Sequence, residues 1–122
     1  MARARILVAE DEPSIAQSLD FILRRADFDV DLVGDGALAL DMMKRQSYGA
    51  VILDIMLPGM NGFDVLRAVR AEERLAALPI VVLTAKGQAN DRRTAEAIGA
   101  SAFITKPFSN AEIVERIREL TA

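Results

Sequence analysis

The sequence contains no cysteine and no histidine among its 122 residues. Without cysteine, the chain can form neither a disulfide framework nor a thiolate metal site. Without histidine, Ser-His-Asp catalysis and histidine-ligated zinc or iron are excluded. Any metal that the protein binds must therefore be a hard cation held by oxygen ligands.

Excess positive charge and long apolar runs are also missing. The chain has 15 Lys and Arg against 18 Asp and Glu, a formal net charge of −3, which argues against a nucleic-acid-binding surface. The apolar run within "MARARILVAE" is far too short for a signal peptide or a membrane span. We therefore expect a cytoplasmic protein that contacts neither nucleic acid nor membrane directly.

The composition nevertheless supports a folded core. Hydrophobic residues make up 52% of the chain, so disorder is not expected. The length suits one domain, and no linker or low-complexity stretch divides the sequence. We expect a single domain over residues 1–122.

Two hydrophobic periods alternate along the chain. Short runs rich in β-branched residues predict strands, and several of these are apolar on both faces, as strands covered from both sides must be. Apolar stripes at spacings of 3, 4 and 7 predict helices between and after them. The expected strands are residues 6–8, 30–33, 51–53, 80–83 and 102–104, and the clearest helical stripes are residues 15–26, 63–70 and 113–120.

Capping residues agree with these boundaries. Ser109 and Glu112 have the spacing of a capping box, Asp35 and Asn90 can cap the second and fourth helices, and Gly99 can end the fourth helix. The alternation of five strands with helices predicts an α/β fold, a doubly wound (βα)5 domain with a central five-stranded parallel sheet and helices on both faces.

Polar side chains follow the predicted strands. In such a sheet the reactive site lies outside the carboxyl ends of the strands, so these positions are the informative ones. They place several acids, a hydroxyl and an amine at one edge. The residues are Glu10, Asp11 and Glu12 after the first strand, Asp54 after the third, Thr84 and Ala85 at the end of the fourth, and Thr105, Lys106 and Pro107 at the end of the fifth.

Taken singly, each of these residues has a structural explanation. Asp11 can cap a helix and Asp54 can start a turn, while Thr84 suits a strand and Lys106 a solvated surface. Taken together they are harder to explain, because two unit charges 4 Å apart interact by about 4 kcal/mol at an effective dielectric near 20. Crowded carboxylates need a cation, and Mg²⁺ suits a site with one or two carboxylates.

Four strings at four strand ends carry a family resemblance: "ILVAEDEP", "VILDIMLPGMNG", "VVLTA" and "FITKPF". From Arg5 to about Leu120 the chain resembles the receiver domains of bacterial two-component response regulators, of the chemotaxis-regulator kind. The resemblance implies a flavodoxin-like strand order 2-1-3-4-5. It also implies a phosphorelay function, with a sensor histidine kinase or phosphotransfer protein as donor and a downstream protein or a C-terminal output domain as target.

The resemblance implies a metal-assisted phosphoacceptor. Asp54 would accept the phosphoryl group. Asp11, Asp54 and the backbone carbonyl of Met56 would bind Mg²⁺ or Mn²⁺. Glu10 stands where many receivers have a second Asp, and its longer side chain would reach the metal through water.

The resemblance also implies the phosphoryl-binding and switch residues. Lys106, Thr84 and Ala85 would contact the phosphoryl group, and Pro107 matches the family's cis Lys-Pro bond. Thr84 would move toward the phosphoryl group while Phe103 turns inward, which would alter the surface of the fourth helix, fifth strand and fifth helix. Ordinary core packing is the alternative role for Phe103.

Two further positions would affect the lifetime of the acyl phosphate. In the family these positions flank the site, and here they hold Met56 and Lys86. For Lys86 we expect a solvated side chain.

The stretch "GASAF" lacks the acidic residues of receivers that dimerise through the fourth and fifth helices. We therefore do not expect that dimer, and we expect Glu112 and Arg116 to pair on the surface of one helix.

Three alternatives compete with a phosphoacceptor. A haloacid-dehalogenase-type hydrolase needs an acid two residues after Asp54, where Met56 stands and can protonate nothing. A flavodoxin-type cofactor carrier needs a phosphate-cradling first loop, whereas Glu10-Asp11-Glu12 would repel phosphate. A degenerate receiver would act as a scaffold without phosphorylation. We expect a signalling switch that catalyses only its own phosphorylation and slow dephosphorylation, and not a turnover enzyme.

Overall fold

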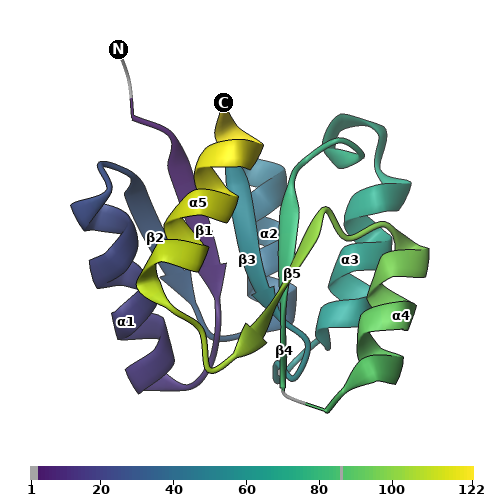
Figure 1. The fold of residues 1–122 in the computed structure, drawn as a ribbon. Helices are drawn as coiled ribbons and strands as arrows, with labels where there is room; N and C mark the ends of the chain where they lie inside the picture. The colour runs from purple at the N-terminus through teal and green to yellow at the C-terminus, as the bar shows by residue number, and fades with distance from the viewer. Residues whose placement is uncertain (1–2, 86) are drawn as a thin grey trace.

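The computed structural model describes residues 3–85 and 87–122. Within them, strands and helices alternate from end to end (Figure 1). The elements are β1 (Arg5–Ala9), α1 (Pro13–Arg25), β2 (Asp29–Val33), α2 (Gly36–Arg45), β3 (Ala50–Asp54), α3 (Gly62–Ala71), the 3-10 helix η1 (Glu73–Leu75), β4 (Ile80–Ala85), α4 (Ala89–Ile98), β5 (Ala102–Lys106) and α5 (Asn110–Thr121).

All five strands form one parallel sheet in the order β2-β1-β3-β4-β5. The predicted fold and strand order are thus confirmed. Parallel strands end at a common edge, which is the lower edge in Figure 1, opposite the two chain termini. The loops that lead into α1, α3, α4 and α5 all leave this edge.

Two helical layers cover the sheet. α1 and α5 pack on one face, whereas α2, α3 and α4 pack on the other. Every residue of β3 is buried, and successive side chains of a strand point to opposite faces. Accordingly, Val51 and Leu53 join the core under α2 and α3, and Ala50 and Ile52 join the core under α1 and α5.

Two of the predicted caps are present. The Asp35 carboxylate accepts a hydrogen bond from the Leu38 N–H at 2.9 Å, and the Ser109 hydroxyl accepts one from the Glu112 N–H at 3.1 Å. Each bond satisfies a backbone donor that a helix leaves unpaired at its N-terminus.

The fourth helix differs from the prediction at its start. Gly99 ends α4, with φ +121°, as predicted. The cap predicted at Asn90 is wrong, because α4 begins at Ala89 and Gln88 takes the N-cap position without a side-chain bond. Gly87, with φ +87°, turns the chain just before this point, so the helix begins earlier than the capping pattern indicates.

The predicted surface pair of α5 is also wrong. Arg116 pairs with Glu119, at 3.0 Å, and not with Glu112. Both acids lie about one helical turn from Arg116, so either can face it, and spacing alone does not select between them.

Among the described residues, no helix is both long enough and apolar enough to cross a membrane.

Candidate functional site

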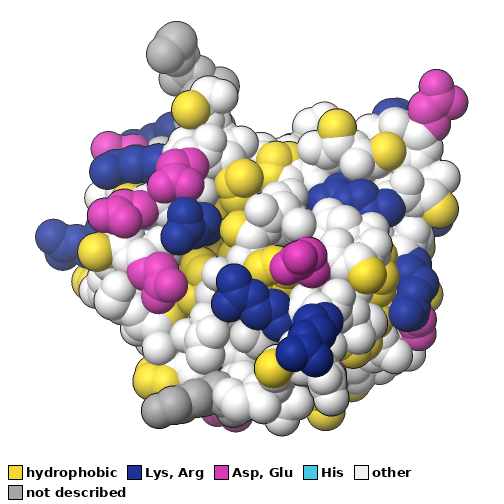
Figure 2. All heavy atoms as spheres, turned by 45° about the vertical axis from the view of Figure 1, so that its right-hand side comes forward, with side chains coloured by type: hydrophobic (Ala, Val, Ile, Leu, Met, Phe, Trp, Pro, Cys, Tyr) yellow, Lys and Arg dark blue, Asp and Glu magenta, His cyan; other side chains and the backbone are white. Residues whose placement is uncertain are grey.

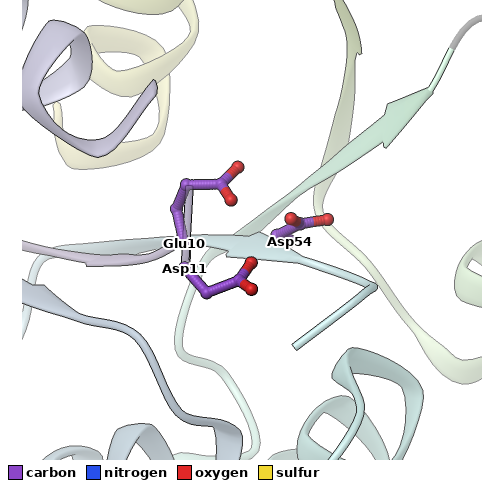
Figure 3. A group of neighbouring side chains, drawn as sticks. All are labelled: Glu10, Asp11 and Asp54. Carbon is purple, nitrogen blue, oxygen red and sulfur yellow. The ribbon is translucent and has the colours of Figure 1, made fainter. Parts of the chain in front are cut away.

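Three carboxylates meet at the carboxyl edge of the sheet. Glu10 and Asp11 follow β1, and Asp54 ends the neighbouring strand β3. Carboxylate oxygens of all three lie within 4.8 Å of one another, and the side chains of Glu10 and Asp11 point toward the side where Asp54 lies (Figure 3). Glu10 and Asp54 are only 3% and 6% exposed, whereas Asp11 is exposed. The fold therefore places Asp54 beside Glu10 and Asp11, from which it is far apart in the sequence.

Lys106 supplies positive charge to two of these acids. Its Nζ lies 2.8 Å from Glu10 Oε1 and 3.1 Å from Asp54 Oδ2. Lys106 ends β5, so its side chain reaches across β4 to contact Asp54. Because Glu10 and Asp54 are buried, this ammonium offsets a charge that would otherwise be costly to desolvate.

Burial and charge shift the pKa values of this pair. Burial raises the pKa of the Glu10 carboxyl, and Asp54 adds to the rise, although Lys106 and the Glu12 N–H oppose it. Burial alone would lower the pKa of the Lys106 ammonium, but its contacts with Glu10 and Asp54 outweigh burial and raise that pKa. Lys106 therefore stays protonated at neutral pH.

Backbone donors fix both buried carboxylates. The Glu12 N–H donates to Glu10 Oε2 at 3.0 Å, and the Met56 N–H donates to Asp54 Oδ1 at 3.2 Å. The Met56 side chain is 77% exposed. The resemblance implied the Met56 carbonyl as a metal ligand, whereas the observed contact with Asp54 is made by the Met56 N–H.

A cavity of about 240 Å³ opens beside Asp54. It is lined by an acid, a hydroxyl residue and an amine that the sequence predicts at strand ends, namely Asp54, Thr84 and Lys106. Its lining residues are Asp54, Ile55, Met56, Leu83, Thr84, Ala85, Gln88, Asp91 and Lys106. The residues implied as phosphoryl-binding therefore border one space, and Gln88 and Asp91, which sequence reasoning missed, border it as well.

Three predicted residues remain to be placed: Pro107, Phe103 and Lys86. The Lys106–Pro107 peptide bond is cis, the isomer that the resemblance implied. Phe103 is half-buried, does not line the cavity and packs against the core on the α3 and α4 side. The guanidinium of Arg92, a residue of α4, lies 4.9 Å from the centre of the Phe103 ring. Phe103 therefore contacts both the core and α4. Lys86 lies outside the described residues.

Glycines position the loop that follows Asp54, and sequence reasoning did not identify them. A Cβ at Gly36 would lie 1.7 Å from the Met60 carbonyl oxygen, and a Cβ at Gly62 would lie 2.6 Å from the Asp54 carbonyl oxygen. The Gly62 N–H also donates to the Ile55 carbonyl at 2.8 Å. For Gly62 the string "PGMNG" was the available signal, because closely spaced glycines mark a tight backbone approach.

A parallel sheet in this strand order, with clustered acids and a lysine at its carboxyl edge, defines a receiver domain of a two-component system. The chain matches the family described as the response regulator receiver domain over residues 6–118, and it belongs to that family. It is the receiver domain of a response regulator.

Curated relatives support this assignment. The DNA-binding response regulator MtrA of Mycolicibacterium smegmatis is 44% identical over 116 residues, which are 95% of this chain and 50% of MtrA. The sensory transduction protein RegX3 of the same species is 40% identical over 113 residues, 93% of this chain and 48% of RegX3. The chain therefore spans about half the length of the curated relatives it matches.

Solved structures agree. The receiver domain of the sensor histidine kinase PA1611 from Pseudomonas aeruginosa PAO1, with a magnesium ion coordinated in its active site cleft, has a TM-score of 0.91 at 32% identity, covering 98% of each chain. The chemotaxis response regulator CheY4 of Vibrio cholerae has a TM-score of 0.90 at 27% identity, covering 98% of this chain and 99% of that one. The scaffold and hydrolase alternatives are not favoured by these relatives.

Proposed function

We propose that Asp54 accepts a phosphoryl group from a sensor histidine kinase or a phosphotransfer protein, in the cytoplasm. One observation carries this proposal: a buried carboxylate borders a 240 Å³ cavity while Lys106 Nζ lies 3.1 Å from its Oδ2. A structural carboxylate would need no such space beside it. Thr84 and Ala85 line the same space and are the expected contacts of the phosphoryl oxygens.

The transfer is a displacement at phosphorus. A carboxylate oxygen of Asp54 forms a P–O bond while the P–N bond of the phosphohistidine breaks, and the imidazole nitrogen leaves with the electron pair. Such a reaction depends mainly on positioning and charge neutralisation. The Lys106 ammonium lies beside Asp54, and as a compact point charge it can pair with a phosphoryl oxygen.

The acidic cluster fits a divalent cation. Glu10, Asp11 and Asp54 present oxygen ligands within 4.8 Å of one another, the donor set that Mg²⁺ or Mn²⁺ prefers. Asp11, Asp54 and the Met56 carbonyl would hold the cation directly, and Glu10 would hold it through water. A bound cation would offset the negative charges of the carboxylates and of the phosphoryl group.

The protein acts as a switch and not as a turnover enzyme in this proposal. Two residues after Asp54, the exposed Met56 has no group that can protonate a leaving group. The phosphoryl group therefore stays until slow autodephosphorylation removes it. Movement of Thr84 and Phe103 passes the signal to a downstream protein or to an output domain, as the greater length of the relatives suggests.

Intact mass measurement tests the proposal. After incubation with acetyl phosphate and Mg²⁺, the native protein should gain one phosphoryl group, and the Asp54→Asn variant and an EDTA-treated sample should gain none. Equal gain by the Asp54→Asn variant would place the acceptor elsewhere. If acetyl phosphate fails, phosphoramidate supplies a P–N donor, and failure of both donors would contradict the proposal.

A further inference from the structure

The first turn of α4 borders the phosphoryl cavity. Asp91 and Gln88 line it together with Asp54, Thr84 and Lys106. Asp91 is half-buried and Gln88 is exposed. Asp91 therefore carries a carboxylate at the boundary between the cavity and the solvent.

This carboxylate adds to an unfavourable charge balance. Among the described residues that line the cavity, Lys106 is the cationic one, and it already pairs with Glu10 and Asp54. Together with Lys106, the proposed divalent cation would offset the charges of Glu10, Asp11 and Asp54, so Asp91 adds a negative charge that these groups do not offset. A phosphoryl group brings roughly −1.5 to −2 further charges. Half-buried charges interact more strongly than solvated ones, so the charge of Asp91 opposes an approaching phosphoryl group.

We propose that Asp91 is a specificity-determining residue that selects the phosphodonor by charge. This inference rests on the proposed function of Asp54. A free donor such as acetyl phosphate has only the contacts of its own small molecule with the cavity to offset the repulsion. A donor protein offsets the repulsion through contacts across its whole interface, so Asp91 favours transfer from a protein over phosphorylation by small metabolites.

A purely structural role is the competing explanation. An acid in the first turn of a helix is stabilised by the helix dipole, and Asp91 lies in the first turn of α4. Asp64 has the same residue type in the first turn of α3 and does not line the cavity. Asp64→Asn is therefore a matched control, because it removes one charge from the same helical position.

Phosphorylation rates of the full chain test the inference. The reagents are doubly charged acetyl phosphate, whose P–O bond breaks as acetate leaves with the electron pair, and singly charged phosphoramidate, whose P–N bond breaks as ammonia leaves. With Mg²⁺ at low ionic strength, we expect Asp91→Asn to be phosphorylated by acetyl phosphate about threefold faster than native protein. The gain should be smaller with phosphoramidate and should shrink as salt screens the charge.

The controls separate the possible outcomes. Asp64→Asn should react at the native rate, and Asp91→Glu should remain slow because it keeps the charge. Equal rates for native protein and Asp91→Asn with both donors would overturn the inference and leave Asp54 as the acceptor. Equal acceleration in Asp64→Asn would overturn it too, since the effect would then be one of net charge. Phosphorylation of no variant by either donor would refute the acceptor role and, with it, this inference.

Discussion

At the scale of single residues, Lys106 forms ion pairs with both buried acids of the site, Glu10 and Asp54. Its side chain is 24% exposed, and those of Glu10 and Asp54 are 1% and 8% exposed. Removing one partner of a buried ion pair leaves an uncompensated charge, which is much more destabilising than the loss of a surface pair. The same acids are the proposed metal ligands, so stability and metal binding depend on one set of charges.

We predict that Lys106→Met lowers the free energy of unfolding by about 1–3 kcal/mol at neutral pH, because Glu10 and Asp54 lose their cation. Saturating Mg²⁺ should restore part of this loss. Urea unfolding with and without Mg²⁺ measures both effects. Lys44→Met is the control, since Lys44 is half-exposed and lies 4.0 Å from Glu72. An equal loss in both variants would show that the buried acids do not depend on Lys106.

Tyr48 is the single tyrosine of the chain, and its hydroxyl donates to Asp31 Oδ2 at 2.8 Å. Burial raises the pKa of this hydroxyl, and the hydrogen bond and the charge of Asp31 raise it further. In the unfolded chain the pKa is near 10. The folded state therefore holds its proton to higher pH, and the stability that the neutral hydroxyl provides is lost as the pH rises above about 10.

We expect unfolding free energy above about pH 10 to fall more steeply in native protein than in Tyr48→Phe, by about 1.4 kcal/mol per pH unit. Urea unfolding at several alkaline pH values measures this difference. Tyrosinate absorbance should likewise appear at lower pH in unfolded protein than in folded protein. Parallel stability curves for the two proteins would show that Tyr48 does not titrate differently on folding.

At the scale of elements, the loop between β3 and α3 determines where the site residues lie. It packs against the start of α2, where a Cβ at Gly36 would overlap the Met60 carbonyl oxygen. Gly62 begins α3 and lies against the backbone of Asp54 and Ile55. The two glycines therefore let three chain segments approach closely beside Asp54, the proposed phosphoacceptor.

Gly62→Ala should destabilise the protein by about 1–3 kcal/mol, because the new Cβ would lie 2.6 Å from the Asp54 carbonyl oxygen and overpacking has that order of cost. Helix propensity alone predicts the opposite sign, since Ala is favoured over Gly in helices. Gly34→Ala is the control, because its nearest contact would be an ordinary 3.7 Å. Urea unfolding that shows Gly62→Ala to be as stable as native protein would contradict the steric argument.

The predicted elements were accurate where local pattern decides structure. All five strands were found, and the structure extends them by one or two residues because pairing adds positions such as Asp29, which lies opposite Arg5. Prediction failed where two local solutions compete. Gln88, and not Asn90, takes the N-cap position of α4, and Arg116 pairs with Glu119 and not with Glu112. Neither choice is encoded in a spacing rule.

The site residues, like the elements, could be predicted only where a local pattern determines their position. Residues directly after strands, such as Asp11 and Asp54, could be placed because parallel strands end at one edge. Asp91 could not, because its position beside the cavity depends on how the chain turns between β4 and α4. That turn includes Gly87, whose positive φ a sequence pattern does not specify.

At the scale of the whole molecule, α4 is the least anchored α-helix. Among the described residues, it buries only Ala95, whereas α5 buries two residues and α1, α2 and α3 each bury four. Figure 2 shows the side of the molecule that carries α4 and β5, where Lys and Arg side chains gather. Arg92 of α4 lies over the ring of Phe103 in β5. Since little apolar area holds α4, a change at the cavity can shift it at low cost.

We therefore predict that a phosphoryl mimic changes amide hydrogen exchange mainly between Ala85 and Phe103. Beryllofluoride with Mg²⁺ serves as the mimic, and the proposed movement of Thr84 and Phe103 is the physical reason for the expected change. The strand β2 should exchange at the same rate with and without the mimic, because it lies at the edge of the sheet opposite β5. Asp54→Asn should show no response anywhere. Unchanged exchange in α4 of the native protein, with mass spectrometry showing the mimic bound, would exclude α4 as the moving element and leave Phe103 an ordinary core residue.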